Sequence, residues 1–293
     1  MHSFLRAVGF GSINSRSDEE KLISLVIENA TEKQVIRLSE DRSVVELLME
    51  VAEDTGIVVR GETDAQGVFR VAHYFPFRRG NTITTEEPLF VNKRVDTDAY
   101  TGMCDDYRIG VSLIFYIQNV VDYLKNPIEK KERRRCPVYL SALATDGKIL
   151  LPVEKSQKEV EKVKSDLQSR SALIAEAKQG NQEAMQNLTL DDIDQYALVS
   201  RRIRKEDIYS IVETSFIPYG SESDNYSILG YINSVERLKN FYTREEFYVL
   251  NVECNEMNYD VCIHVDDLLG EPEPGRRFRG NVWMQGRVEL ELH

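Results

Sequence analysis

The sequence predicts an α+β protein with an N-terminal α+β region, a central hairpin and helical segment, and a C-terminal antiparallel β-rich region that forms a small barrel or a sheet. Three patterns carry this prediction: helical spacing of apolar residues near the N-terminus, an Asp-Gly turn signal in the middle, and strict alternation beyond Asp207. We place the regions at residues 1–128, 136–206 and 207–293 of a chain of 293 residues.

The first predicted element is a helix that begins at a capping box. Ser17 precedes Glu20 by three residues, a spacing at which each side chain can bond the other residue's backbone N–H. Apolar residues then recur at 3.6-residue spacing on one face: Leu22, Ile23, Val26, Ile27 and Ala30.

Strands follow in the rest of the N-terminal region. Residues 56–62 and 68–77 are β-rich and flank a glycine-bearing connection, which predicts a hairpin. The apolar residues of 43–54 fit neither the 3.6-residue period of a helix nor the two-residue period of a strand, so this segment could be either. Residues 109–124 are also ambiguous, and we favour a buried strand through Gln118 followed by a short helix.

The central region begins with a second predicted hairpin. Asp146-Gly147 is a two-residue type I′ turn signal, and folding about it places six apolar residues on one face. Residues 154–204 then show 3–4 spacing, which predicts helices in an exposed arm or insertion. A coiled coil that binds a partner is the alternative, although fewer than three clean heptads are present.

Five strands are predicted in the C-terminal region, on alternation of apolar and polar residues. We expect a small, partly open barrel or an antiparallel sheet packed on the rest of the chain. The five strands are Ile208–Ile217, Tyr226–Val235, Glu246–Asn255, Tyr259–Val265 and Phe278–Leu290.

A two-residue turn at Met257-Asn258 would gather polar groups on one face of the predicted sheet. Glu253 would lie opposite Cys262, next to His264, which suggests a nucleophile pair or a weak transition-metal site. Residues two apart on a strand are about 7 Å apart at the backbone, which is wide for a thiolate–imidazole bond. We therefore favour a half-solvated polar face without a metal.

His73 is the second candidate, because it shares a strand face with Phe69, Val71, Phe75 and Phe77 and is followed by Arg78 and Arg79. It could act as a base at the rim of an aromatic pocket in which the arginines hold a small anionic ligand. The favoured alternative is a histidine at the edge of the core with one hydrogen bond.

The third candidate is the glycine- and arginine-rich stretch near the C-terminus. Arg276, Arg277 and Arg279 could bind a carboxylate or phosphate beside Trp283, or they could form internal ion pairs, which we favour. The glycines match neither a P-loop nor a dinucleotide fingerprint. We assign no catalytic residue and no cofactor.

The composition of the chain argues against several classes of function. The net charge of −12 and pI of about 5.0 disfavour binding to nucleic acid or to an anionic membrane surface. The four cysteines form no C-x-x-C pair, and the longest apolar run is far shorter than a membrane span. No secretory signal pattern opens the sequence, so we expect a reduced, cytoplasmic protein without membrane association.

The residues at both ends of the chain are similar to those of a known family. They resemble a family of proteins of about this length from anaerobic Firmicutes, a domain of unknown function, which implies a bacterial cytoplasmic origin but assigns no site residue. The residues concerned are Met1–Phe10 and the closing Gly275, Arg276, Arg277, Phe278, Gly280, Trp283, Gln285 and Gly286.

The leading functional hypothesis is a non-enzymatic binding or assembly module that self-associates through sheet or arm surfaces. One alternative is an enzyme or small-ligand binder whose pocket lies between the two regions and uses His73 and the arginines. The other is single-strand nucleic-acid binding by the C-terminal β region, which would need basic and aromatic residues on one sheet face and is opposed by the acidic balance.

Overall fold

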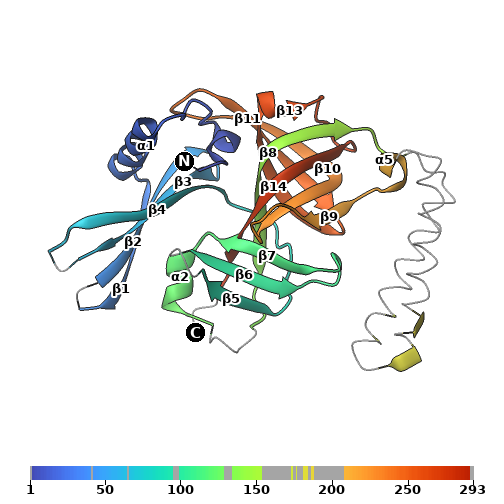
Figure 1. Cartoon of the computed structure of the whole chain (residues 1–293), viewed down its shortest axis with the longest axis horizontal. Helices are drawn as coiled ribbons and strands as arrows, with labels where there is room; N and C mark the ends of the chain where they lie inside the picture. The colour runs from blue at the N-terminus through green and yellow to red at the C-terminus, as the bar shows by residue number, and fades with distance from the viewer. Residues whose placement is uncertain are drawn as a thin grey trace. The chain divides into compact units, whose positions relative to one another are not determined.

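The structure is a computed structural model, and Figure 1 shows its elements. It describes residues 2–40, 42–64, 66–94, 99–128, 134–153 and 208–290, with Leu173, Glu176, 181–183 and 186–187. The chain divides into two compact units, Met1–Leu150 with Thr214–His293, and Leu151–Glu213. Most of the helical segment predicted for 154–204 lies outside the described residues.

The described residues are mostly β, so the α+β prediction is wrong. Two ambiguous or misread segments account for much of the difference. Residues 43–52 belong to a strand that ends at Ala52, and the residues of the predicted central hairpin form one long strand. The α-helices of the first unit are α1 (Arg16–Glu28) and the short α2 (Val120–Lys125).

The N-terminal part forms a four-stranded antiparallel sheet in the order β1-β2-β3-β4. Its strands are β1 (Glu32–Ser39), β2 (Arg42–Ala52), β3 (Thr55–Thr63) and β4 (Phe69–Arg78). The predicted hairpin of residues 56–62 and 68–77 is therefore present as β3 and β4. Consecutive residues 44–47 of β2 are all buried, which explains why this strand shows no alternation.

Helix α1 packs on β2 and β3, as its apolar face predicts. Leu22 and Val26 are buried, whereas Ile27 remains exposed. The cap is Ser15 rather than Ser17: the Ser15 hydroxyl accepts the Asp18 N–H at 3.2 Å. The helix thus begins two residues earlier than the sequence predicts.

The larger sheet contains a closed five-stranded barrel, with β14 bonded to both β10 and β8 so that no barrel edge remains open. Its ring order is β8-β12-β11-β10-β14. The strands are β8 (Val138–Leu150), β10 (Asn225–Lys239), β11 (Glu246–Cys254), β12 (Met257–His264) and β14 (Arg277–Val288).

Further strands extend this sheet beyond the barrel (Figure 1). β7 (Ser112–Ile117) pairs with β14 and leads through β6 (Tyr100–Asp105) to β5 (Leu89–Lys93). The strand-then-helix prediction for 109–124 is confirmed by β7 and α2. The short β9 (Ser215–Pro218) pairs with β10, and β13 (Leu268–Leu269) pairs with β8.

The hairpin predicted at Asp146-Gly147 is wrong, because β8 runs straight through these residues. Asp146 pairs with Asn281 and Gly147 with Gly280 on β14. A Cβ at Gly147 would lie 2.4 Å from the Phe278 ring and 2.8 Å from Ile263. The glycine therefore admits a large side chain inside the barrel rather than making a turn.

The turn predicted at Met257-Asn258 is also wrong, and the actual turn residues are Asn255 and Glu256. Both have positive φ, 50° and 62°, as a type I′ turn requires. Met257 is fully buried at the start of β12. The pairing differs from the predicted one by four residues, since Leu250 faces Val261 rather than Val265.

The first unit has two hydrophobic cores. One fills the barrel interior and the space under β5–β7. The other lies between the outer face of the barrel and the N-terminal sheet, α1 and the 3-10 turn η1 (Leu5–Val8). This second core, which includes Phe247, Cys262 and Trp283, fixes the N-terminal sheet against the barrel.

Among the described residues, no helix is both long and apolar enough to span a membrane. Two further short helical elements are α5 (Ile208–Ile211), in the second unit, and the 3-10 turn η2 (Val265–Asp267). Residues 208–217, predicted as one strand, therefore contain a helical turn before β9.

Candidate functional site

A cleft of about 370 Å³ lies between the N-terminal sheet and the junction of β7, α2 and β14. This volume is within the range of small-molecule sites. Its lining is rich in charged and amide side chains, with three apolar ones: Glu32, Gln34, Glu46, Leu48, Val58, Phe77, Arg79, Gly80, Asn81, Gln118, Asn119, Asp122 and Arg287.

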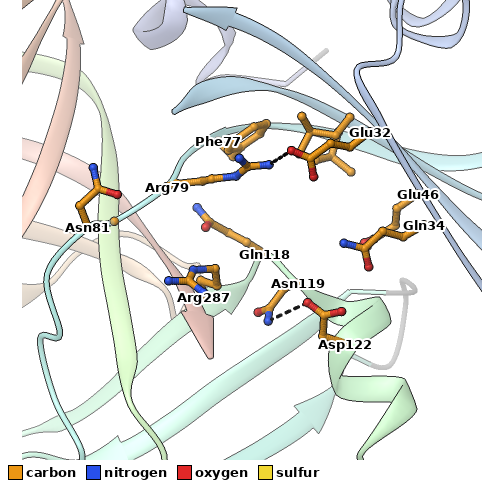
Figure 2. Close-up of a pocket in the computed structure, with 13 residues that line it drawn as sticks. Glu32, Gln34, Glu46, Phe77, Arg79, Asn81, Gln118, Asn119, Asp122 and Arg287 are labelled. Carbon is orange, nitrogen blue, oxygen red and sulfur yellow. Dashed lines mark hydrogen bonds and ion pairs between the residues drawn. The ribbon is translucent and has the colours of Figure 1, made fainter. Parts of the chain in front are cut away.

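Charges of opposite sign are segregated within this lining apart from Glu32, which pairs with Arg79. Figure 2 shows Arg79 and Arg287 on one side of the cleft and Gln34, Glu46 and Asp122 on the other. The elements explain the separation: the two arginines come from the residue after β4 and from β14, whereas the opposite side comes from β1, β2 and α2.

Arg79 is held by the sheet itself. Its guanidinium pairs with Glu32 at 2.6 Å and with Glu50 at 3.2 Å, and it lies over the Phe77 ring at 5.7 Å. Both carboxylates come from neighbouring strands, so the Arg79 charge is largely neutralised before any ligand arrives.

Arg287 differs from Arg79 in its partners. Its guanidinium carbon lies 4.3 Å from the centre of the Tyr139 ring. No carboxylate in the described ranges forms an ion pair with it. The carboxylate of Glu289 also lies on this side, where it accepts a hydrogen bond from the Tyr139 hydroxyl at 2.7 Å. A half-buried guanidinium that rests on an aromatic ring without a direct ion pair is preorganised to receive an anion.

On the side of the cleft opposite the arginines, the Gln34 side chain has a hydrogen-bond acceptor without a donor. Its Oε1 atom is buried, and no donor among the described residues bonds to it. A buried carbonyl without a hydrogen bond costs about 1–3 kcal/mol. Such groups are rare in folded proteins, and a bound donor would remove the cost.

Behind this side of the cleft lies a buried ion pair. The Arg60 guanidinium donates to the Glu46 carboxylate and stacks on Phe75 at 5.3 Å. It also lies 3.4 Å from the Tyr116 hydroxyl, on β7. Burial raises the pKa of the Glu46 carboxyl, against the opposing effect of Arg60, and raises the pKa of Tyr116 to about 12.

The floor of the cleft is an amide network that joins β7 to β14. Gln118 Nε2 donates to Gln285 Oε1 and to the Arg78 carbonyl, both at 2.8 Å. Asn119 bonds both backbone groups of Val288, at 2.8 and 3.0 Å. These bonds fix the backbone on which Arg287 is carried.

Of the residues predicted around His73, Phe77 and Arg79 line the cleft. His73 lies behind it, with Nε2 at 3.0 Å from the Tyr116 hydroxyl and 3.2 Å from Arg60. Arg78 points the other way and bonds Asp260 of β12 at 3.1 Å. Alternation along β4 separates Arg78 from Arg79.

The predicted C-terminal arginines and Trp283 do not gather in this cleft. Arg276 pairs with Glu273 at 2.8 Å, Arg277 is buried on β14, and Arg279 lines a second cleft of about 250 Å³. Trp283 is packed in the second core, where its Nε1 donates to Asp224 at 2.9 Å.

The structure also separates the predicted Cys262, His264 and Glu253 group. Glu253 is exposed and faces Asn258, whereas Cys262 and His264 are buried, because the second core covers this face of the barrel. Burial raises the pKa of the Cys262 thiol to about 12, so it stays protonated at neutral pH. No group of metal-binding side chains occurs among the described residues.

Sequence reasoning missed Gln34 and Arg287, the two cleft residues on which the site depends. No local signal could have identified them, because Gln34 lies on an exposed-looking strand and Arg287 follows the glycine-rich stretch. Their importance depends on the absence of a partner in three dimensions, and a sequence does not record that.

The chain matches, over residues 5–286, the family described as "Domain of unknown function, E. rectale Gene description (DUF3881)". No curated protein and no solved structure matches it. The match spans the N-terminal sheet, nearly all of the barrel and every residue that lines the cleft except Arg287, which lies one position beyond it. The protein therefore belongs to the DUF3881 family of domains of unknown function.

Proposed function

We propose that the protein is a binding module that holds a small polar molecule in the cleft between the N-terminal sheet and the β7–α2–β14 junction. The observation that carries the proposal is the buried Gln34 Oε1 atom without a donor. Arg287, without a carboxylate partner in the described ranges, supports it from the other side. Both groups gain a partner only when something polar enters.

A thermal-shift screen tests this proposal with amino acids, carboxylates, amines, sugars and nucleosides as probes. A compound present at about 100 times its Kd should stabilise the protein by about 2.7 kcal/mol, which shifts the melting temperature by several degrees. Gln34→Trp should abolish the shift because the indole fills the cleft. Gln66→Trp, at an exposed position outside it, should keep the shift.

Two results would contradict the proposal. In one, no class of probe raises the melting temperature of the unmodified protein. In the other, a probe stabilises Gln34→Trp as much as the unmodified protein, which would place the binding site elsewhere.

A second candidate function is self-association through β1. This strand is an edge of the four-stranded sheet, and Val35 and Leu38 on it are 49% and 44% exposed. Exposed edge strands pair readily with another chain. Light scattering should then show a dimer that Val35→Lys reduces to a monomer, and a monomeric unmodified protein at high concentration would exclude this candidate.

A further inference from the structure

We propose, on the basis of the binding function above, that the ligand is a small zwitterion whose ammonium and carboxylate groups are several bonds apart. The first support is the segregation of charge in the cleft. Arg287 lies on one side, and the Gln34 and Asp122 oxygens lie on the other (Figure 2). A ligand with a single charge would satisfy only one of these sides.

The anionic end of the ligand is assigned to Arg287. Arg79, the other guanidinium in the lining, already holds Glu32 and Glu50. Arg287 rests on Tyr139 and is carried on backbone fixed by Asn119. Its planar fork therefore suits a carboxylate, with two parallel charge-assisted hydrogen bonds.

The cationic end is assigned to Gln34 and Asp122. An ammonium group has three donors and no acceptor, which matches an amide oxygen beside a carboxylate. Gln34 Oε1 has no donor in the described part of the chain. Asp122 has two donors among the residues that the structure describes, Lys125 and Asn119, each at 3.4 Å. Glu46 adds negative potential from the same side, although Arg60 neutralises most of it.

The part of the ligand between its two charged groups is inferred from the remaining residues that line the cleft. Leu48, Val58 and Phe77 give the cleft an apolar part. Arg287 and Gln34 lie on opposite sides of a cleft of about 370 Å³, which has room for several methylene groups between them (Figure 2). A ligand whose charged groups are separated by such a chain can reach both sides, whereas the adjacent charges of an α-amino acid suit them less well.

The test uses isothermal titration of the full chain with 5-aminopentanoate, and with pentanoate, pentylamine, glycine and glucose as comparison probes. We expect 5-aminopentanoate to bind at least about tenfold more tightly than any of the four, since each charged end adds a charge-assisted hydrogen bond. Equal binding by pentanoate or pentylamine would overturn the zwitterion assignment.

Variants assign each end of the ligand. Arg287→Gln should weaken 5-aminopentanoate binding by about 10- to 100-fold and leave pentylamine unchanged. Gln34→Leu should weaken binding of 5-aminopentanoate and pentylamine and leave pentanoate unchanged. Arg16→Gln, at a side chain 91% exposed outside the cleft, is the matched control. Equal weakening of all probes by Arg287→Gln would contradict the assigned orientation.

The failure of this inference can be distinguished from failure of the proposed function. If glucose or a nucleoside stabilises the protein but not Gln34→Trp, the cleft binds a ligand and only the zwitterion assignment fails. If none of the probes in the screen binds, both fail. Circular dichroism and urea unfolding establish that each variant is folded before its titration is interpreted.

Discussion

At the scale of single residues, Gly147 does not form the turn that the dipeptide Asp146-Gly147 predicts. Asp-Gly is a strong turn signal in isolation, yet Gly147 lies in the extended part of β8. The residue is small because Phe278 and Ile263 occupy the space where a side chain would be. A packing requirement and a turn requirement thus lead to the same dipeptide.

Gly147→Ala should therefore destabilise the barrel by about 1–3 kcal/mol, since the added methyl group overlaps the Phe278 ring. Urea unfolding measures the change. Thr145→Ala, at an exposed position of the same strand, serves as the control and should change stability by less than about 0.5 kcal/mol. A neutral Gly147→Ala variant would show that the ring moves aside without cost.

His2, also at the scale of single residues, makes a contribution to folding stability that depends on pH. It lies 4.8 Å from the Trp283 ring, and burial lowers the pKa of His2 to about 4. The folded state therefore favours the neutral imidazole. Its contribution to stability is present above pH 6.5, the unfolded value, and is lost as the pH falls from there through about 4.

We expect the unmodified protein to lose about 2 kcal/mol more stability between pH 7 and pH 4.5 than His2→Phe, which keeps an aromatic ring against Trp283. Urea unfolding at both pH values gives this difference. Equal losses of stability in the two proteins would mean that the pKa of His2 is the same in the folded and the unfolded state.

At the scale of elements, period-two alternation predicted which residues of β11 and β12 share a face even though the predicted turn was wrong. The prediction that the face with Cys262 and His264 is half-solvated was also wrong, since both residues are buried. The observed pairing differs by four residues, an even number, so each residue keeps its face. The turn itself was missed because neither Asn255 nor Glu256 is glycine. Positive φ at Glu256 is costly, and the sequence gives no sign of it.

Glu256→Gly should stabilise the protein by about 0.5–1 kcal/mol, because Asn-Gly is the preferred type I′ pair and glycine adopts positive φ without strain. Glu253→Gly, at an exposed position within β11, should have the opposite sign. Calorimetric melting temperatures measure both. A fall in both variants would indicate that the flexibility added by glycine outweighs the strain that it removes.

At the scale of the whole molecule, the Arg60–Glu46 pair links the two sheets of the first unit. Arg60 and Glu46 belong to the N-terminal sheet, whereas Tyr116, 3.4 Å from Arg60, belongs to β7 of the larger sheet. The sequence shows runs of apolar residues in β2 and β3 without indicating that one glutamate and one arginine are buried together.

Arg60→Met should cost about 3–5 kcal/mol, because it leaves the Glu46 carboxylate buried without a counterion. Arg60→Met combined with Glu46→Leu should recover most of this loss, since neither charge then remains. Urea unfolding of the single and double variants measures the coupling. If the double variant is no more stable than Arg60→Met alone, the pair itself contributes the stability.

The candidate site also belongs to this scale. Arg79 was among the predicted residues, and it is one of thirteen that line the cleft. The others are spread from Glu32 to Arg287, over both sheets and α2. Similarly, the burial of Cys262 and His264 follows from the second core on the outer face of the barrel. Both features arise from packing between segments far apart in sequence.

The sequence by itself determined the helix α1, the β3–β4 hairpin, the β7–α2 segment and which residues of β11 and β12 share a face, because capping, turn chemistry and alternation act over a few neighbouring residues. Only the tertiary structure decided the straight β8, the closure of the barrel by β14 and the cleft. Those features depend on which strands meet, and contacts between distant residues leave no periodic trace in the chain.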